Sequence, residues 1–551
     1  MQGTEPPSTV PALLRSVAAA RGAHAAIATA RETVSYDDLE RRTARMARAL
    51  LALGAGKGAR IALIAPDGVL WITTFLAGLR IGALMSVVST LCTPPELAHI
   101  LRNSDIQIFI GVRGFLRHDY LRTLTGALPS VSGGRAEALR TPEAPYLRSV
   151  WLDDAAGLGW ARSIDELLAR ADGPDAPDAA LLAAVEEQVV PSDEAVIVYT
   201  SGSTSAPKAV THTQSNVTRH PRALADYFLL KPDDRMLPQL PAFWLGGMVM
   251  AMEVLSVGAT LVYPETPEIE VVADTIERLG VNRVNGWGDG LARLRQAAAA
   301  RGIEVDKIVG LGPFRDQAGA LIPPQLQVNM LGMSETFAAH SAERLDFRLP
   351  EDKAGASGRT VGGYERRVVD PETGVEVAPG QVGELQIRGG ALMAGFYKVD
   401  PRQVFTPDGF YPTSDLVRLD ADGYLYFVAR RGDMIKTKAA NVSRLEVEAA
   451  LRTLPEVELP IVVGLPDPDL GQMVAAAIVP APGAAPTEQA LQAALRETLS
   501  SYKVPRRIVF ITHDDVPRTA TGKLKLFELA GMIAERIGQP PADAADGPQP
   551  P

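Results

Sequence analysis

The stretch YTSGSTSAPKAV, residues 199–210, decides how the rest of the chain is interpreted. It begins at the end of AVIVYT, an apolar run with β-branched residues that predicts a buried strand. The polar stretch is therefore expected to be a loop that leaves a strand. Its hydroxyls, its backbone N–H groups and Lys208 offer hydrogen-bond donors and positive charge to phosphate oxygens. A flexible Ser/Thr/Gly linker is the alternative interpretation, and the rest of the chain must decide.

Composition limits the kind of protein that carries this loop. The chain has 551 residues, of which 46% are hydrophobic and 22% charged, as in a soluble globular protein of two or more domains. A net charge of −10 provides no basic field for nucleic acid. Seven histidines and one cysteine argue against a His/Cys metal cage, and the lone Cys92 excludes an internal disulfide. We therefore expect a cytoplasmic protein.

Two segments bear on targeting and on membrane insertion. The first residues, MQGTEPPSTV, lack the basic and apolar regions of a signal peptide. The run VLWITTFLAGLRIGALMSVVSTLC is long and apolar, but Arg80 interrupts it. A buried helix followed by a strand is therefore expected here, and no transmembrane segment.

Helical and strand patterns alternate over most of the chain, which predicts α/β architecture with largely parallel sheets. Residues 10–22 and 36–54 have helical spacing, ARIALIAP predicts a strand, and a helix follows from Leu70. From about residue 358 the pattern changes to short strands separated by glycine, such as GELQIRG. This change indicates a smaller β-rich subdomain.

The C-terminal region forms a separate pattern of roughly 100 residues, a normal domain size. SRLEVEAALRTL predicts a capped helix, ELPIVVGLP and MVAAAIVP predict strands, and TEQALQAALRETLSSY predicts another helix. The Pro/Ala/Asp-rich end is expected to be disordered. The predicted divisions are a large domain over 1–431, a smaller domain over 432–535, and a tail over 536–551.

Three further segments complete a pattern with the first loop: LGMSET (331–336), YPTSDLVRLDADGYLYFVARRGDMIK (411–436) and PRTATGKLK (517–525). In this order and spacing, the four resemble the adenylate-forming superfamily of acyl-CoA synthetases, nonribosomal-peptide adenylation domains and beetle luciferase. The resemblance extends over roughly residues 10–530. It implies a large N-terminal domain of two α/β subdomains and a β-rich subdomain, followed by a small mobile α+β domain.

The resemblance also implies residue roles. The loop would hold the β- and γ-phosphates, LGMSET would hold Mg²⁺ and the α-phosphate, and the TSD segment would hold the ribose. Glu335 is the predicted Mg²⁺ ligand, and Lys523, Glu335 and Thr204 are the predicted catalytic residues. The predicted ATP-binding residues are Thr200, Ser201, Gly202, Ser203, Thr204, Lys208, Gly332, Met333, Ser334, Asp415, Arg430 and Lys523. Ser205 and Ala209 stand where the family usually has glycine.

The implied reaction has two halves. A carboxylate attacks the α-phosphorus of Mg·ATP, pyrophosphate leaves, and Lys523 reduces the repulsion between the two anions. The small domain then turns about Gly432 and presents a second site, predicted to be Lys436, Ala439 and Asn441, where coenzyme A displaces AMP. Ala439 stands where acyl-CoA synthetases usually have glycine, so its methyl group is expected to narrow the pantetheine tunnel.

The predicted acyl pocket is lined by Phe243, Trp244, Gly246 and Trp287; for the large aromatic side chains among them, plain core packing is an equally weighted alternative. No charged residue there would pair with a substrate amine. An apolar acid is therefore favoured: fatty, aryl or alicyclic.

The predicted activity is that of an AMP-forming acid–CoA ligase. Its predicted substrates are ATP, coenzyme A and a small carboxylic acid, and its predicted cofactor is Mg²⁺. Two alternatives stay open: an acyl-AMP ligase that loads a carrier-protein phosphopantetheine, and a catalytically impaired nucleotide-binding homologue. The glycine replacements favour the impaired homologue, while the retained Glu335, Asp415, Arg430 and Lys523 argue against it. No nucleic-acid partner is expected, and a homodimer is left open.

Overall fold

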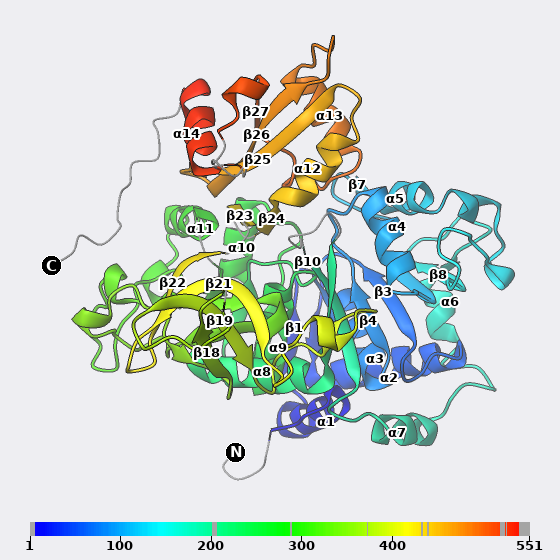
Figure 1. Ribbon diagram of the computed structural model, residues 1–551. Coiled ribbons are helices and arrows are strands. Elements are labelled where there is room, and N and C mark those ends of the chain that lie inside the picture. Colours follow the sequence, from blue (N-terminus) through cyan, green and yellow to red (C-terminus); the bar gives the residue numbers. More distant parts are fainter. Residues whose placement is uncertain are drawn as a thin grey trace. The chain divides into compact units, whose positions relative to one another are not determined.

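The computed structural model describes residues 6–200, 207–286, 289–371, 373–430, 434–437, 440–517, 524 and 526–538. The chain separates into two compact units (Figure 1). The larger unit comprises residues 1–90, 98–199 and 209–431, and the smaller comprises residues 91–97, 200–208 and 432–551.

The largest sheet among the described residues has eight strands in the order β20-β11-β10-β4-β3-β5-β8-β9. Its central pairs are parallel, as the alternation of helices and strands predicted. Its strands are β3 (Arg60–Ile64), β4 (Leu84–Val87), β5 (Ile108–Gly111), β8 (Ser149–Leu152), β9 (Arg162–Ser163), β10 (Glu194–Thr200), β11 (Lys208–Thr213) and β20 (Gly395–Phe396).

A second mainly parallel sheet in the described part of the chain has the order β14-β12-β13-β1-β2. Its strands are β1 (Ala25–Ala28), β2 (Thr33–Ser35), β12 (Arg235–Pro238), β13 (Thr260–Val262) and β14 (Arg283–Asn285). The helices of the larger unit are α1 (Val10–Arg21), α2 (Tyr36–Ala52), α3 (Val69–Arg80), α4 (Pro94–Asn103), α5 (Tyr120–Ala127), α6 (Ile164–Ala169), α7 (Ala179–Glu187), α8 (Gln214–Tyr227), α9 (Leu245–Val257), α10 (Ile269–Arg278) and α11 (Asp289–Ala300). Residues 94–97 of α4 are assigned to the smaller unit.

The long apolar stretch around Arg80 forms helix α3 and strand β4, as predicted. Nearly every residue of α3 is buried, and the helix packs against β3, β4 and α2. Arg80 is also buried, and its guanidinium pairs with Glu186 at 2.6 Å and Glu40 at 2.8 Å. These carboxylates compensate for the loss of hydration of the charge. No helix in the described ranges is long and apolar enough to span a membrane.

The β-rich part of the larger unit contains two antiparallel sheets in the described residues. The first joins β15 (Leu331–Met333), β16 (Ala338–Ala342) and β17 (Arg359–Thr360). The second has the order β18-β19-β21-β22, with β18 (Glu365–Val369), β19 (Val382–Arg388), β21 (Tyr411–Leu419) and β22 (Leu425–Arg430). Alternate residues of β21 are buried, as expected for a strand with one face on the core.

The smaller unit is an α+β sheet domain. Its strands are β23 (Met434–Thr437), β24 (Ala440–Ser443), β25 (Val457–Asp467), β26 (Gly471–Pro480) and β27 (Arg507–Phe510), and its helices are α12 (Arg444–Arg452), α13 (Glu488–Arg496) and α14 (Leu526–Arg536). Ser443 accepts the Glu446 N–H and caps α12, as the sequence predicted. Apolar residues are buried on both faces of the long β25–β26 pair. The predicted fold class is confirmed.

Candidate active site

The LGMSET motif forms a tight turn between the antiparallel strands β15 and β16. Thr336 fixes this turn: its Oγ1 accepts the Met333 N–H at 3.2 Å and lies 2.7 Å from the Ala338 carbonyl oxygen. Gly332 lies so close to the facing strand that an added Cβ would be 2.2 Å from that same oxygen. A larger residue at position 332 therefore requires the two strands to separate.

The residues after the turn adopt a strained backbone. Phe337 has φ 45° and Ala338 has φ 96°, in the region that side chains other than glycine rarely adopt. Neighbouring groups hold this conformation: the Tyr364 hydroxyl donates to the Thr336 carbonyl at 2.6 Å, and the His212 ring packs edge-on against Phe337. Strain that is held by its surroundings is typical of functional sites, which supports a functional role for this turn.

Glu335 lies at the centre of the turn, and its carboxylate is buried to 7% exposure. The Tyr411 hydroxyl of β21 donates to Glu335 Oε1 at 3.2 Å. The Met393 N–H donates to the Glu335 carbonyl at 2.8 Å. The Met393 contact holds the backbone of Glu335, and the Tyr411 contact holds its carboxylate. The third motif segment, which contains Tyr411, therefore sets the direction of the carboxylate.

The strand that follows the polar loop also reaches the turn. His212, in β11, lies with Nε2 2.7 Å from the Ser334 carbonyl oxygen. Because a carbonyl only accepts, Nε2 carries the proton of this neutral ring. Strand β20 extends the connection, since it pairs with β11 at Val210 and Thr211. The motif turn is thus hydrogen-bonded to β21, within the third segment, and to β11, the strand in which the polar stretch ends.

Asp415 lies where β21 departs from regular pairing. It is 4% exposed, and its backbone N–H donates to Thr413 Oγ1 at 3.1 Å. In the register of the sheet, Asp415 faces Arg430 of β22. The backbone therefore brings together Asp415, the predicted ribose-binding residue, and Arg430, another predicted ATP-binding residue.

Several predicted site residues lie outside the described residues, and their roles stay predictions: Ser201, Gly202, Ser203, Thr204, Trp287, Gly432, Ala439 and Lys523. The side chains of Arg430 and Asn441 are likewise outside the description. Thr200 ends β10 and Lys208 begins β11, so the loop follows a strand, as expected.

The donor set at Glu335 fits a magnesium ion. Mg²⁺ is bound in nucleotide enzymes by one or two carboxylates together with phosphate oxygens and water. No group of three or more acidic, histidine or cysteine side chains within the described ranges forms an all-protein cage. A metal ion that binds together with a nucleotide needs only one fixed carboxylate from the protein. Glu335 would therefore hold the Mg²⁺ ion.

Three buried histidines surround the turn: His212, His220 and His340, each at most 2% exposed. Burial lowers the pKa of His212 to about 3, of His220 to about 4 and of His340 to about 3. His220 Nε2 lies 2.9 Å from the carbonyl oxygen of Ala339. All three rings are therefore neutral near pH 7, and they stabilise the turn only in that state.

The segment PAFWLGG, predicted to border the acyl pocket, leads into helix α9. Phe243 is 5% exposed and its ring packs edge-on against Trp244. The Asp67 carboxylate, in the loop after β3, accepts the Ala242 N–H at 2.8 Å. Burial raises the pKa of Asp67 to about 6. Gly247 also packs tightly against this segment: an added Cβ would lie 2.2 Å from the Pro241 carbonyl oxygen.

Within the smaller unit, the predicted thioester residues belong to the β23–β24 hairpin. Lys436 faces Asn441 across the hairpin, and its side chain is exposed. The Lys436 N–H donates to the Gln472 side chain at 2.8 Å, which ties the hairpin to β26. The exposed Lys436 therefore belongs to a strand that is held by the sheet of the smaller unit.

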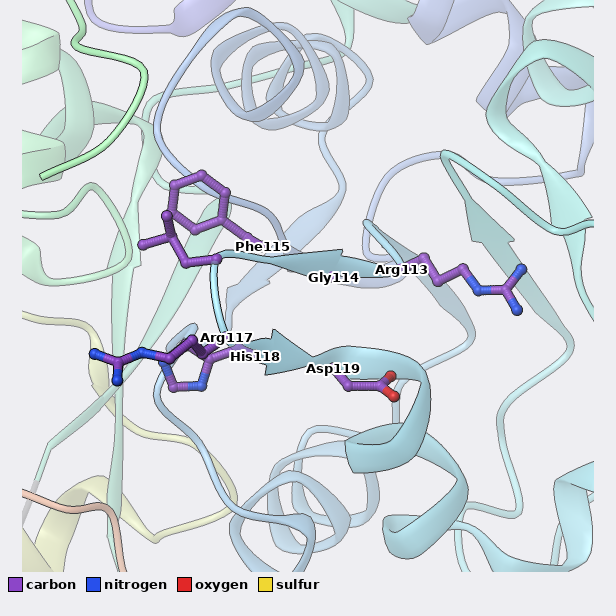
Figure 2. A pocket seen from close by; sticks show the side chains of 7 residues that line it. Arg113, Gly114, Phe115, Arg117, His118 and Asp119 are labelled. Atoms are coloured by element: carbon purple, nitrogen blue, oxygen red, sulfur yellow. The ribbon is translucent and has the colours of Figure 1, made fainter.

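A cavity of about 390 Å³ lies elsewhere, at the hairpin of β6 (Gly114–Phe115) and β7 (His118–Asp119) (Figure 2). The side chains in Figure 2 project from both strands and the turn between them. Two of its charged side chains already have partners: Arg113 pairs with Asp154, and Asp119 caps helix α5. This cavity shares no residue with the motif segments.

Sequence reasoning missed the residues that hold the motifs in place: His212, Tyr364, Met393 and Tyr411. Only Tyr411 left a usable signal. It lies four residues before Asp415 in a strand with alternating burial, and a period of two puts both on one face. Hydroxyl and ring contacts from distant segments leave no such pattern in one sequence.

The fold, with its large α/β unit and small α+β unit, and the motif turn are those of the adenylate-forming enzymes. A model of the AMP-binding enzyme family matches residues 14–397, and a model of the AMP-binding enzyme C-terminal domain matches residues 446–523. The chain belongs to the AMP-binding enzyme family. The recognition of an adenylate-forming enzyme of the acyl-CoA synthetase type is confirmed.

Individual proteins show the same likeness over nearly the whole chain. The 3-hydroxybenzoate–CoA/4-hydroxybenzoate–CoA ligase of Thauera aromatica is 30% identical, over 94% of this chain and 96% of its own. A feruloyl-CoA synthase of an Amycolatopsis species is 29% identical, over 92% and 94%. Among solved structures, the amide bond synthetase McbA of Marinactinospora thermotolerans aligns with a TM-score of 0.74 at 24% identity, covering 94% of this chain and 99% of its own. The last likeness bears on the fold alone.

Proposed function

We propose that the protein is an ATP-dependent acid–thiol ligase that activates an apolar carboxylic acid to acyl-AMP and then forms its CoA thioester. The observation that carries the proposal is the junction at Glu335. There, β11 contacts the motif turn through His212, and β21 contacts it through Tyr411. One turn is thus connected to the strand after the loop and to the strand that carries Asp415. Relatives named as aryl-CoA ligases support the same reaction class.

In the first half-reaction, these residues position the nucleotide for attack. Asp415 binds the ribose hydroxyls, since a carboxylate accepts two hydrogen bonds from a vicinal diol. Ser334 contacts the α-phosphate, and the loop hydroxyls and Lys208 bind the leaving phosphates. Glu335 would hold Mg²⁺, which would supply positive charge to the phosphate oxygens. The role assigned to Lys523 is to reduce the repulsion between the attacking carboxylate and the α-phosphate.

In the second half-reaction, the smaller domain turns about Gly432 and replaces Lys523 with the β23–β24 hairpin. The thiol of coenzyme A attacks the acyl carbonyl carbon, a carbon–sulfur bond forms, the carbon–oxygen bond to AMP breaks, and AMP leaves. Lys436, Ala439 and Asn441 are the residues assigned to the thiol path. The apolar PAFWLGG segment, with Phe243 buried beside Trp244, supports an apolar acid as the substrate.

The proposal is tested by incubating the protein with Mg·ATP and a panel of medium-chain, long-chain and aryl acids, with and without CoA. Chromatography follows pyrophosphate, AMP and thioester. CoA-dependent AMP and thioester are expected with at least one acid class. Acyl-AMP and pyrophosphate without thioester would instead identify a carrier protein as the acceptor. ATP binding without pyrophosphate from any acid would favour the impaired homologue.

Glu335→Gln is expected to reduce pyrophosphate release by about 100-fold or more, because the amide loses the charge that holds Mg²⁺. The Mg²⁺ concentration for half-maximal rate should rise as well. The glutamine oxygen still accepts from Tyr411, so the thermal midpoint should stay within a few degrees. Glu343→Gln, which removes a charge that pairs with Arg359 on the same sheet, is the matched control and should keep the metal dependence. An unchanged Mg²⁺ requirement in Glu335→Gln would remove Glu335 from the metal site.

Ala439→Gly is expected to leave pyrophosphate release unchanged and to accelerate thioester formation, because it removes the methyl group predicted to narrow the pantetheine tunnel. Single-turnover mixing of preformed acyl-AMP with CoA measures this step alone. Ala440→Gly, the next position along the chain, is the control for added backbone freedom. A slower thioester step in Ala439→Gly, at unchanged adenylation, would contradict the tunnel argument.

A further inference from the structure

The TSD segment of β21 is an irregular insertion in the β19–β21 ladder. Gln386 faces Pro412 and Glu384 faces Leu416, so the three residues Thr413, Ser414 and Asp415 lie opposite the single Leu385. A bulge of this kind re-aims side chains and is common beside active sites. It also takes backbone groups out of the ladder, and in a buried place these need other partners.

Two side chains supply those partners. The Thr413 hydroxyl donates to the Leu385 carbonyl at 2.8 Å and accepts the Asp415 N–H at 3.1 Å. The Glu384 carboxylate accepts the Ser414 N–H at 3.1 Å through Oε1. Thr413 and Glu384 are both buried, at 1% and 7% exposure. The backbone of the bulge is therefore bound by a hydroxyl on its own strand and a carboxylate on the neighbouring strand.

The backbone conformation of Ser414 is the reason why the Glu384 carboxylate is needed. The φ of Ser414 is 63°, in the left-handed region, although this residue is not a glycine. A non-glycine residue in this region is disfavoured by a factor of about 5 to 30 in population. The residue that follows it is Asp415, so any relaxation of Ser414 toward ordinary φ values rotates the backbone that carries the predicted ribose-binding carboxylate.

We infer that Glu384 is a positioning residue for the nucleotide: by accepting the Ser414 N–H it holds the bulge in its left-handed conformation and thereby aims Asp415 at the ribose diol. The inference rests on the ribose role of Asp415 in the proposed function. It assigns a task to the glutamate of GELQIRG, which the sequence marked only as part of a strand. The inference also implies that the effects of substitutions at Glu384 and Ser414 depend on each other.

The test compares binding of ATP with binding of 2′,3′-dideoxy-ATP, by calorimetry with Mg²⁺ and no acid. Wild type should prefer ATP by about tenfold or more, since hydrogen bonds to a charged group are lost with the dideoxy sugar. Glu384→Ala should reduce this preference to within about twofold. A merely structural defect would weaken both nucleotides alike and preserve the ratio. Glu384→Gln keeps an acceptor oxygen and should retain most of the preference.

A double variant tests whether the effect of Glu384→Ala on nucleotide preference acts through Ser414. Ser414→Gly adopts the left-handed conformation without support, so in this background Glu384→Ala should recover about fivefold of the lost preference. Glu365→Ala, which removes an exposed carboxylate of the same sheet, is the matched control and should behave as wild type.

The outcomes separate the inference from the function on which it rests. A wild-type preference that survives unchanged in Glu384→Ala overturns the inference alone. A wild-type protein that binds ATP and the dideoxy nucleotide equally overturns the ribose role of Asp415, and the inference with it.

Discussion

Lys523→Ala is expected to lose acyl-AMP formation, with the rate of pyrophosphate release falling about 1000-fold. The residue is the proposed positive charge between two anions that must approach each other, and removing one such preorganised group has an effect of this size. Single-turnover release of pyrophosphate, with the acid identified by the panel, measures the loss. Thioester formation from added acyl-AMP should persist, because Lys523 moves away before that step.

The matched control is Lys525→Ala, which removes a lysine from the same TGKLK motif and should keep at least about half of the wild-type rate, as is usual for charges away from the reaction. Circular dichroism and thermal melting should be alike in both variants. Acyl-AMP formation by Lys523→Ala at the wild-type rate would refute the role given to this lysine.

Acidification is expected to unfold the larger unit steeply, because His212, His220 and His340 are buried and neutral. Their folded-state pKa values of about 3 to 4 lie below the ordinary value of 6.5. Their stabilising contribution is therefore fully present above pH 6.5 and is lost as the pH falls, since the unfolded chain takes up three protons that the folded chain does not. Between pH 5.5 and 4.5 the free energy of unfolding should fall by about 4 kcal/mol from these residues, roughly 1000-fold in the equilibrium constant.

Tryptophan fluorescence in urea at several pH values measures this slope, because all five tryptophans belong to the larger unit. Buried carboxyls with raised pKa, such as Asp67, act with the opposite sign, so the histidine contribution is read from variants. His340→Asn should reduce the slope by about 1.4 kcal/mol per pH unit, the value for one proton. His118→Asn, at an exposed position, is the control and should leave it unchanged. A slope unaltered in His340→Asn would contradict the argument.

The sequence determined the elements and the class of protein. Alternating patterns such as ARIALIAP and the helix after it are local, because burial of one face imposes a period of 2 or 3.6 on neighbouring residues. The four motif segments carried the adenylate-forming resemblance, and the family match confirms it. Ser443 was predictable as a helix cap for the same local reason: its partner is three residues away.

The tertiary structure alone decided how the site is held. Tyr411 reaches Glu335 across 76 residues, and His212 reaches Ser334 across 122, so the sequence does not indicate which residue either side chain contacts. Ser414 gave no hint that it would adopt a left-handed φ, because that conformation is imposed by a bulge whose position depends on how β19 pairs with β21. Local sequence specifies which residues prefer a helix or a strand; the pairing of distant strands specifies where a buried carboxylate points.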